Sequence, residues 1–491
     1  MSLTAADMDA ARPQAGDDGA SSGTLTREGA GALVGGTTVA LLMALLPLEV
    51  SVGMVGGLAL LVGMTASPVI GLYALLAAIP FSPTFGIEDA SFSISAFEPL
   101  AALLLLTWLV RGVHRRDIQL PTGGLAGALY GLVVVLLISS AQAANLPLAM
   151  KETLKWALLV VAFVLTSACV RGESAMRGLL AALFFAGGGQ AFMGLVQVAA
   201  GFGPAEFALG GIMRAHGNFG QPNPFAGYLG TILPLAVTMA AVSHPGRFRT
   251  IAAATAVCIG LAILLSQSRG AWLGLVLSFA IMAVAWGART RRLVVPTLAA
   301  GLVFVVLALT GVLPPALANR VTSVTSNFGI FDVREVVLSP ENHAVVERMA
   351  HWQAGWEMFV DEPLLGIGPG NYPASYADYY VTPWREALGH AHNYYLNMAA
   401  EAGLAGVLAL SIVLFLAFRT LLQRFRAIER GGAAYAGRLT LSRAFGRALA
   451  VGLLGSLVML CTHNLFDNLL VHGVGIQIGI LLGLIGGVST R

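Results

Sequence analysis

Residues 250–267 read TIAAATAVCIGLAILLSQ, a run of 18 positions without a charged side chain. Arg247 and Arg249 stand just before this run, and Arg269 stands just after it. One helix of about 20 apolar residues is long enough to cross the roughly 30 Å hydrocarbon core of a bilayer. The run therefore predicts a transmembrane α-helix and places the chain among membrane proteins.

The same pattern extends along most of the chain. Its 491 residues are 57% hydrophobic and only 11% charged, with a mean hydropathy of +0.79. Soluble domains carry about 25% charged residues, so composition excludes an ordinary soluble protein. We expect an all-α polytopic membrane protein of about 14 transmembrane helices, with 12 as the other possible count. The apolar runs are 30–47, 50–66, 68–83, 97–113, 123–143, 153–170, 177–199, 224–243, 250–267, 270–287, 293–313, 403–420, 446–462 and 469–488.

The arginines predict the orientation of these helices. With both termini in the cytoplasm, 20 of the 28 basic residues fall in cytoplasmic stretches, as the positive-inside rule requires. We expect a disordered cytoplasmic tail at 1–29, which lacks the apolar core of a signal peptide. Transmembrane helices 1–11 follow at 30–313, an extracytoplasmic, partly helical loop at 314–402, and helices 12–14 at 403–491.

The sequence supports neither a nucleic-acid partner nor a disulfide framework or zinc site. The basic residues form no run of the kind that binds nucleic acid, so no nucleic-acid partner is expected. Cys169, Cys258 and Cys461 lie singly in apolar runs, which argues against a disulfide framework or a zinc site.

Among the basic residues expected on the extracytoplasmic side, two arginines lie beside predicted membrane helices. Arg269 lies in the stretch SQSRGAWLG at 266–274, between two apolar runs. A charge at mid-membrane costs about 2.5–3.5 kcal/mol on insertion scales, so it favours a cavity with an anionic partner. The other interpretation is an interfacial arginine that reaches the lipid headgroups. Arg214 opens the tract RAHGNFGQPNPFAGY, whose end starts a helix, and such a helix N-terminus suits phosphate oxygens.

The long loop is expected to contain one amphipathic helix. Ser339 is the predicted N-cap with Pro340 in the first turn, and Asp361-Glu-Pro363 is the predicted end. Arg348 and His351 are expected on its polar face, away from an apolar stripe of Val345, Met349, Trp352, Trp356 and Phe359. The following GIGPGN segment at 366–371 has no strand before it and no lysine after it, which excludes a phosphate loop.

Beyond this helix comes the segment His390-Ala-His-Asn-Tyr-Tyr-Leu396. Histidines two positions apart cannot share one helix face, and spacing reveals no third metal ligand. An imidazole can take a proton from a sugar hydroxyl. We favour His392 as a general base over His390, with structural hydrogen bonding as the alternative for both. His463 and Asp467 are expected to pair at the outer end of the thirteenth span.

In this order, the motifs resemble the O-antigen ligase and polymerase superfamily of bacterial membrane glycosyltransferases. They are Ser268-Arg-Gly-Ala-Trp-Leu-Gly274, Arg348 to Trp352 with Asp361 to Asn371, and His390 to Leu396 with Glu401-Ala-Gly403. The resemblance implies transfer of a glycan from undecaprenyl pyrophosphate to an acceptor hydroxyl at the periplasmic face of the inner membrane. It implies no cofactor and no metal.

The resemblance also implies roles for individual residues. His392, with His390, would act on the acceptor hydroxyl. Arg214, Arg269 and Arg348 would hold the pyrophosphate. Supporting positions are Asn393, His216 and Ser268.

The resemblance leaves the acceptor open. In ligases the acceptor is the lipid A-core, which we favour; in polymerases it is another lipid-linked glycan. A polysaccharide or lipid transporter is the alternative from another class. Transporters carry ionisable residues near mid-membrane and show inverted repeats. The candidate residues here are instead expected in extracytoplasmic loops, close to the membrane lipids.

Overall fold

The computed structural model describes residues 48–81, 87–89, 92–95, 97–242, 245–287, 332–339, 342–430 and 441–486, with isolated positions between 301 and 312. The predicted tail at 1–29 and the predicted span at 30–47 lie outside these residues, as does most of the span predicted at 293–313. The chain divides into two compact units, Met1–Leu61 and Val62–Arg491. The described residues of the first unit form the beginning of helix α2 (Leu48–Ala66).

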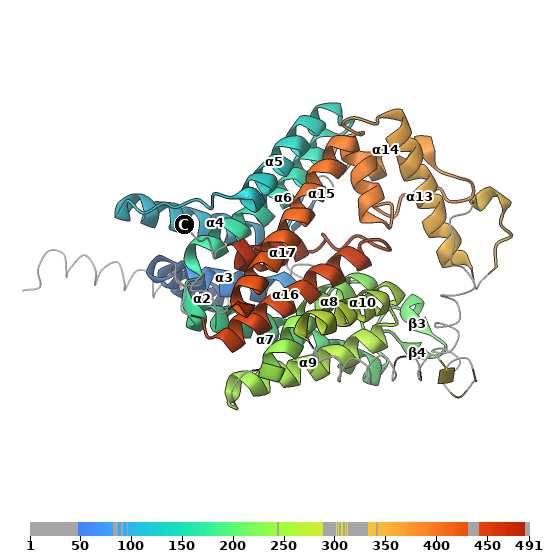
Figure 1. Cartoon of the computed structure of the whole chain (residues 1–491). Helices are drawn as coiled ribbons and strands as arrows, with labels where there is room; N and C mark the ends of the chain where they lie inside the picture. The colour runs from blue at the N-terminus through green and yellow to red at the C-terminus, as the bar shows by residue number, and fades with distance from the viewer. Residues whose placement is uncertain are drawn as a thin grey trace, which may run out of the picture. The chain divides into compact units, whose positions relative to one another are not determined.

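The second unit is almost wholly helical (Figure 1). Its longer helices are α3 (Pro68–Ala78), α4 (Phe97–Arg115), α5 (Gly124–Ser139), α6 (Leu146–Cys169), α7 (Gly172–Ala200), α8 (Pro222–Val242), α9 (Arg247–Ser266), α10 (Arg269–Trp286), α13 (His343–Asp361), α14 (Tyr372–Tyr379), α15 (Tyr394–Glu429), α16 (Arg443–His463) and α17 (Val474–Gly486). Short 3-10 helices are η1 (Ile79–Phe81), η2 (Ser140–Gln142), η3 (Ala205–Phe207) and η4 (Val333–Glu335).

Strands are limited to two small antiparallel hairpins among the described residues. In one hairpin β1 (Ile87–Asp89) pairs with β2 (Phe92–Ile94), and in the other β3 (Ala208–Leu209) pairs with β4 (Ile212–Met213). The second hairpin leads directly into Arg214. The all-α class is therefore confirmed, with these hairpins as local additions to loops.

Eight helices in the described part of the chain are long and apolar enough to cross a membrane. They are α4, α5 with η2, α7, α8, α9, α10, α15 and α16. Three shorter apolar segments, Val50–Ala66, Pro68–Phe81 and Val474–Ile485, accompany them. The protein is thus a multi-pass membrane protein, while the count of 14 spans and the orientation stay predictions.

Helix caps explain where two helices begin earlier than the apolar runs suggest. α6 begins at Leu146 rather than near 153, because the side chain of Asn145 accepts the N–H of Leu148 at 3.2 Å and Pro147 fits the first turn. α15 begins at Tyr394 rather than near 403, because the side chain of Asn393 accepts the N–H groups of the next turn. Both extensions carry polar side chains beyond the apolar runs.

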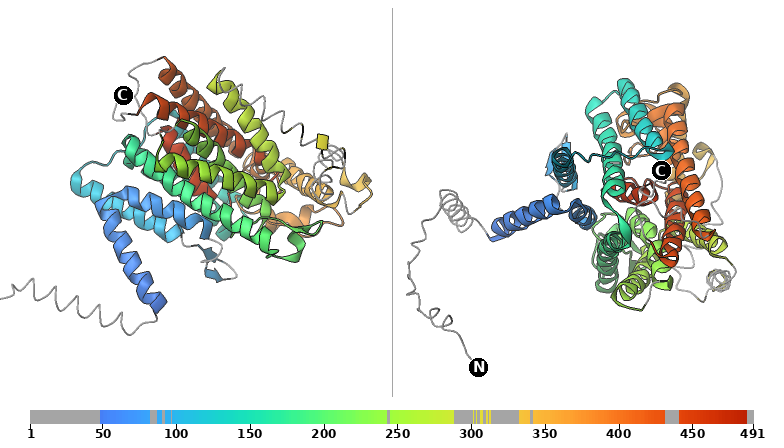
Figure 2. Two further views of the ribbon diagram at one scale, coloured as in Figure 1. Left: turned by 90° about the horizontal axis from the view of Figure 1, so that it is seen from below. Right: turned by 60° about the vertical axis from the view of Figure 1, so that its left-hand side comes forward.

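α8 and α16 are the most buried of the eight candidate spans. Figures 1 and 2 show them side by side with α10. Small residues permit the close approach, since a Cβ added to Gly230 or Gly274 would meet the side chain of Met459 at 2.2 Å or 2.5 Å. The Ser456 hydroxyl donates to the carbonyl of Thr231 at 2.6 Å between α16 and α8. These contacts hold the ends of α8, α10 and α16 in fixed positions.

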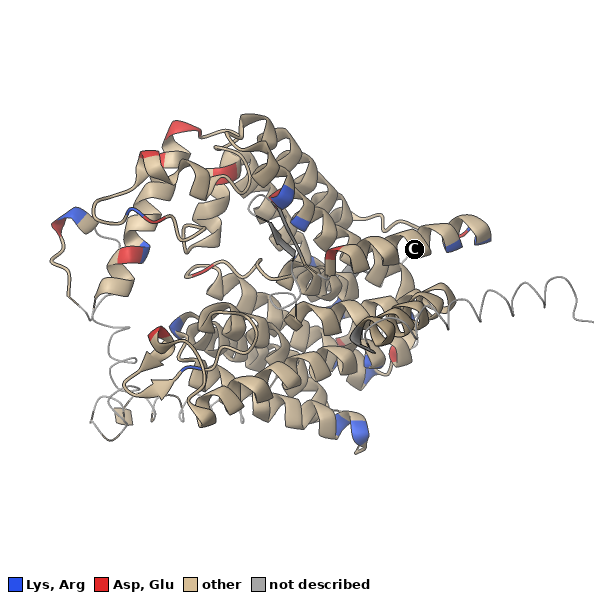
Figure 3. Cartoon of the chain, turned by 180° about the vertical axis from the view of Figure 1, so that it is seen from behind, with Lys and Arg blue, Asp and Glu red and all other residues tan. Residues whose placement is uncertain are grey.

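The helix predicted in the long loop is present as α13, although its start is different. It begins at His343, and Ser339 and Asn342 cap one another: the Ser339 N–H donates to the Asn342 side chain at 2.8 Å and the Asn342 N–H to the Ser339 hydroxyl at 3.3 Å. Its end at Asp361 is confirmed. Figure 3 shows charged residues on α13 and at the ends of several long helices.

Candidate functional site

The segment that ends at His392 is held against the end of α16. The backbone N–H of Tyr394 donates to the carbonyl of Asn464 at 2.8 Å, and the N–H of Ala391 donates to the side chain of Asn397 at 3.1 Å. His392 itself has a φ of 51°. This left-handed conformation is uncommon for a residue other than glycine and is often found at functional sites. The backbone thus turns sharply at the candidate base.

Asp467 completes a cluster with the two histidines. Its Oδ1 lies 3.7 Å from Nε2 of His390 and 3.6 Å from Nδ1 of His392. Asp467 lies in the loop beyond α16, which ends at His463. The pairing of Asp467 with His463 stays a prediction, whereas both histidines of the 390–396 segment lie close to its carboxylate. Its proximity to residues more than 70 positions earlier is a tertiary feature that no local spacing reveals.

Both ring nitrogens of His390 face protein groups. Its Nδ1 accepts the backbone N–H of His392 at 3.0 Å, so in the neutral ring Nε2 carries the proton and faces Asp467. Burial is the main cause that lowers the pKa of His390 to about 4. His390 is therefore neutral at physiological pH and has no nitrogen directed at a substrate. This arrangement favours positioning over direct catalysis for His390.

His392 has a different arrangement. Its Nδ1 is buried and faces Asp467 at a distance slightly beyond hydrogen-bond range. In the described part of the chain, Nε2 of His392 has no hydrogen-bond partner. Because a carboxylate only accepts, the proton belongs on Nδ1 and the lone pair on Nε2. A histidine in this tautomer is competent as a general base.

The carboxyl group of Asp467 is buried yet charged. Burial acts to raise its pKa, but the approach of His392 and the positive charge of Arg348 lower it overall below the usual range. Arg348 lies on α13, so the long loop contributes a cation to this cluster. The resulting negative charge would stabilise a protonated His392 during proton transfer.

His351 does not lie on an exposed polar face as the sequence analysis expected; it is 1% exposed. Its ring stacks on Tyr376 at 4.8 Å between centroids and lies edge-on to His392 at 5.6 Å. Its Nδ1 donates to the hydroxyl of Tyr372 at 3.1 Å, and that hydroxyl donates to the carbonyl of His351 at 2.9 Å. His351 is buried because α14 packs against α13 through Tyr372 and Tyr376.

The two arginine motifs meet at a second place. Nε of Arg214 donates to the carbonyl of Ser266 at 2.7 Å, and its Nη2 donates to the side chain of Asn223 at 3.3 Å. Ser268 is the buried N-cap of α10 and Arg269 is its first residue. The loop before α8 and the junction between α9 and α10 are thus joined through Arg214. Two guanidinium groups and the N-termini of two helices belong to the same region.

His216, for which the resemblance implied a supporting role, stabilises the loop that contains Arg214. It is 6% exposed, its Nδ1 donates to the carbonyl of Arg214 at 3.0 Å, and its ring contacts Phe207 edge-on at 5.1 Å. These contacts fix the backbone at Arg214. We therefore read His216 as a residue that positions the arginine.

The loop that follows α16 connects the arginine region to the histidine cluster. A Cβ added to Gly270, next to Arg269, would meet the ring of His463 at 3.0 Å, and one added to Gly227 in α8 would meet it at 3.1 Å. His463 ends α16, and Asp467 follows four residues later at the histidine cluster. One short segment thus contacts both groups of candidate residues.

His390, His392 and Asp467 could also hold a metal ion. Each offers one ligand atom, and these atoms lie within 4.8 Å of one another. Two imidazoles and a carboxylate are ligands that Zn²⁺ accepts. Sequence spacing does not reveal this possibility, because the third group comes from a distant part of the chain.

Comparison with known proteins bears on the middle of the chain. Residues 254–411 match the family model described as O-antigen ligase. The match includes Arg269, Arg348 and His392, and it leaves out Arg214 and Asp467. No curated protein matches the chain. The resemblance that the motifs indicated is confirmed over this stretch.

Proposed function

From the match of residues 254–411 to the O-antigen ligase family model, we propose that this protein transfers a glycan from undecaprenyl pyrophosphate to an acceptor hydroxyl. The acceptor in this proposal is the lipid A-core, and the reaction takes place at the periplasmic face of the inner membrane. The observation that carries the proposal is the joint packing of His390, His392 and Asp467 at the start of α15.

The reaction begins at the acceptor hydroxyl. Nε2 of His392 takes the hydroxyl proton as the acceptor oxygen attacks the anomeric carbon of the donor sugar. A new glycosidic C–O bond forms while the bond between that carbon and the pyrophosphate oxygen breaks, and its electron pair leaves with undecaprenyl pyrophosphate. A histidine positioned as a general base typically accelerates such a step by about 10²–10⁴-fold.

Asp467 acts through His392. Its carboxylate faces the Nδ1 side of the ring and stabilises the imidazolium that forms when Nε2 takes the proton. It also keeps the lone pair on Nε2, because a carboxylate requires a donor on Nδ1. His390 holds the backbone of His392 through its own Nδ1 and completes this support.

The arginines act on the leaving group. Pyrophosphate gains negative charge as the glycosidic bond breaks, so fixed guanidinium groups stabilise the transition state more than the bound donor. Arg214 and Arg269 are assigned this role, and Arg348 supplies a further positive charge beside the histidine cluster. The N-terminus of α10, where Arg269 stands, adds backbone donors that suit phosphate oxygens.

The test is a transfer assay with purified full-length protein, a lipid-pyrophosphate glycan and lipid A-core. We expect product with the natural sequence and a loss of about 10²–10⁴-fold in kcat with His392→Ala. His390→Asn keeps a polar group and should lose less. Unchanged turnover by His392→Ala at an unchanged melting temperature would remove this residue from the mechanism.

The acceptor is tested in the same assay. Within this proposal we favour a ligase over a polymerase. We expect glycan on lipid A-core when both acceptors are present at equal concentration. Elongation of the lipid-linked glycan in place of lipid A-core modification would identify a polymerase. Movement of the glycan across a vesicle membrane without a new glycosidic bond would identify a transporter.

A further inference from the structure

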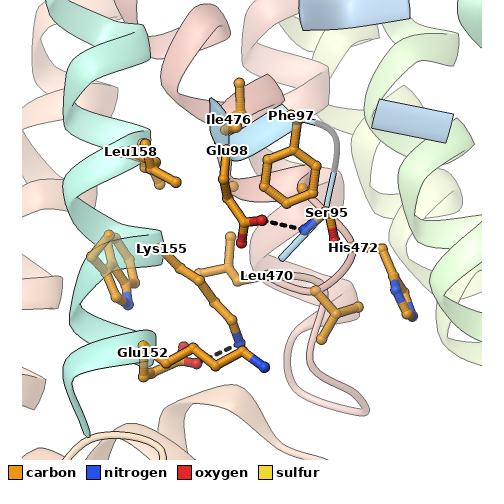
Figure 4. Close-up of a pocket in the computed structure, with 15 residues that line it drawn as sticks. Ser95, Phe97, Glu98, Glu152, Lys155, Leu158, Leu470, His472 and Ile476 are labelled. Atoms are coloured by element: carbon orange, nitrogen blue, oxygen red, sulfur yellow. Dashed lines mark hydrogen bonds and ion pairs between the residues drawn. The ribbon is translucent and has the colours of Figure 1, made fainter. Parts of the chain in front are cut away.

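A cavity of about 280 Å³ lies between α4, α6 and the loop that joins α16 to α17. We call it the lysine cavity, because Lys151 and Lys155 both line it. They are the only two lysines of the chain, which has 28 basic residues in all. Figure 4 shows Glu98 from α4 and Glu152 and Lys155 from α6 around the same space. Both lysine side chains of the protein thus line one cavity.

Two segments of the chain link the lysine cavity to the histidine cluster. Its wall includes Leu470 and His472, which belong to the loop that carries Asp467. Its wall also includes Trp156, whose ring lies 6.4 Å from that of Tyr394, two residues after His392. A group bound in the cavity would therefore be a neighbour of the reacting hydroxyl or of the sugar being transferred.

The charges that line the cavity are balanced. Lys155 pairs with Glu152 at 2.6 Å, and their side chains are 40% and 18% exposed. Glu98 accepts the backbone N–H of Ser95. Two ammonium groups and two carboxylates have no net charge, so an isolated anion would meet as much repulsion as attraction. The lining is suited to a neutral or zwitterionic ligand.

The chemistry of these groups fits a sugar. A sugar hydroxyl both donates and accepts hydrogen bonds; ammonium groups supply the donors and carboxylates the acceptors. The aromatic rings of Trp156 and Phe97 offer apolar faces for the C–H groups of a sugar ring. The volume lies at the lower limit of small-molecule sites, about 300–1,000 Å³, which suits sugar units better than a lipid chain.

We propose that the lysine cavity is a glycan-recognition subsite that binds a sugar unit beside the reacting one. This inference rests on the proposed glycosyl transfer, since that reaction is what brings a glycan to the histidine cluster. The sugar belongs either to the donor glycan or to the acceptor, and both present the same hydroxyl chemistry. Binding in this cavity would add to the affinity for the substrate and would select among sugars.

The two lysines make the test specific. Reductive methylation modifies primary amines, so it reports on Lys151, Lys155 and the N-terminal amino group alone. The full-length protein in amine-free detergent is methylated with and without the oligosaccharide released from its lipid carrier by mild acid. Peptide mass spectrometry then gives the rate at each amine. We expect the glycan to slow methylation of the lysines in proportion to its occupancy, with the N-terminal amine unchanged.

Equal methylation rates at every glycan concentration would overturn the proposed subsite. Methylation and glycan transfer are measured independently, so failure of the subsite and failure of the proposed function can be distinguished. Transfer without protection of the lysines would leave the proposed function and remove the subsite. Protection without transfer would remove the function and leave a glycan-binding cavity.

Variants identify which substrate the cavity holds. Lys151→Met and Glu98→Gln each remove one charged hydrogen-bonding group, so we expect a rise in KM of roughly 10–100-fold for one substrate, with kcat nearly unchanged. A rise for the lipid-linked glycan assigns the sugar to the donor, and a rise for lipid A-core assigns it to the acceptor. Arg385→Met and Glu386→Gln change the same charges at exposed positions and should leave both KM values unaltered.

Discussion

His392 and His390 present their ring nitrogens differently to the same carboxylate. His390 turns Nε2 to Asp467 and His392 turns Nδ1, so only His392 keeps Nε2 for a substrate. A transition metal bound among the three groups would take Nδ1 of His392 in place of its proton, so the neutral ring would carry its proton on Nε2 and could not accept another there. The role of a base and the role of a ligand are therefore mutually exclusive for His392.

Zinc distinguishes these two roles. We expect added Zn²⁺ to inhibit transfer, because it competes for the imidazoles and the carboxylate, and a chelator to restore the rate without reducing it further. His390→Asn should weaken this inhibition, since it removes one ligand. The measurement is the initial transfer rate across a zinc titration. Loss of activity in chelator, regained with zinc, would contradict the proposed base.

Arg269 tests whether the leaving group is held by two parallel hydrogen bonds. Arg269→Lys keeps the positive charge and loses the planar fork, so we expect kcat to fall by roughly 10–100-fold. Arg385→Lys, the same change at an exposed position, is the matched control. A rate equal to that of the natural sequence would argue that charge alone suffices at Arg269.

His351 and His390 together predict a loss of stability in acid. Burial lowers the pKa of His351 to about 3 and that of His390 to about 4, against an ordinary value of 6.5. Between pH 6.5 and 4 the unfolded chain binds more protons at these groups than the folded chain, so stability falls as pH falls. We expect the melting temperature to drop across this range. His351→Gln should reduce the dependence on pH, and an unchanged slope would contradict the burial of a neutral imidazole.

At the level of elements, α15 connects the site to the membrane through a kink. Gly403 interrupts the helix with φ 60° and ψ −161°. A Cβ there would lie 2.4 Å from the carbonyl carbon of Leu364, so the chain of the loop passes directly against this turn. The kink separates the short helix after Asn393 from the apolar length of α15. The part of α15 before the kink lies beside the histidine cluster, and the part after it is apolar enough to cross the bilayer.

Gly403→Ala should therefore damage both stability and activity. The positive φ and the backbone contact each oppose a side chain, and strained backbone positions of this kind cost about 1–3 kcal/mol. We expect a lower melting temperature and reduced transfer. Gly131→Ala in α5 meets nothing within 4 Å and is the control. Equal melting temperatures for the two variants would show that the close approach at Gly403 has no consequence.

At the scale of the whole molecule, the orientation in the membrane remains a prediction from the arginines. After replacement of Cys169, Cys258 and Cys461, single cysteines are introduced as Arg385→Cys and Arg426→Cys. An impermeant maleimide applied to intact spheroplasts should label the first and spare the second, because the long loop is expected outside and the end of α15 inside. The opposite labelling would invert the topology and move the site to the cytoplasmic face.

The apolar runs alone determined the membrane class and most helix positions. A run such as 250–267 has to be a helix in a bilayer, since hydrocarbon offers no partner for free backbone groups. The motif order indicated a resemblance to the O-antigen ligase and polymerase superfamily, and the match at 254–411 confirms this resemblance over that stretch. Polar extensions such as the start of α6 were missed, because a cap at Asn145 determines that boundary and hydropathy does not register it.

Only the tertiary structure decided which candidates act together. Asp467 joins His392, and Arg214 joins Ser266, across separations that no helical or strand period encodes. His351 is buried because α14 packs against it. Lys151 and Lys155 line a cavity because α17 and the loop before it pack against α6. The local sequence pattern reflects which residues face lipid and which face water. Contacts between distant segments depend on how all the helices pack at once, so their partners appear only in the folded protein.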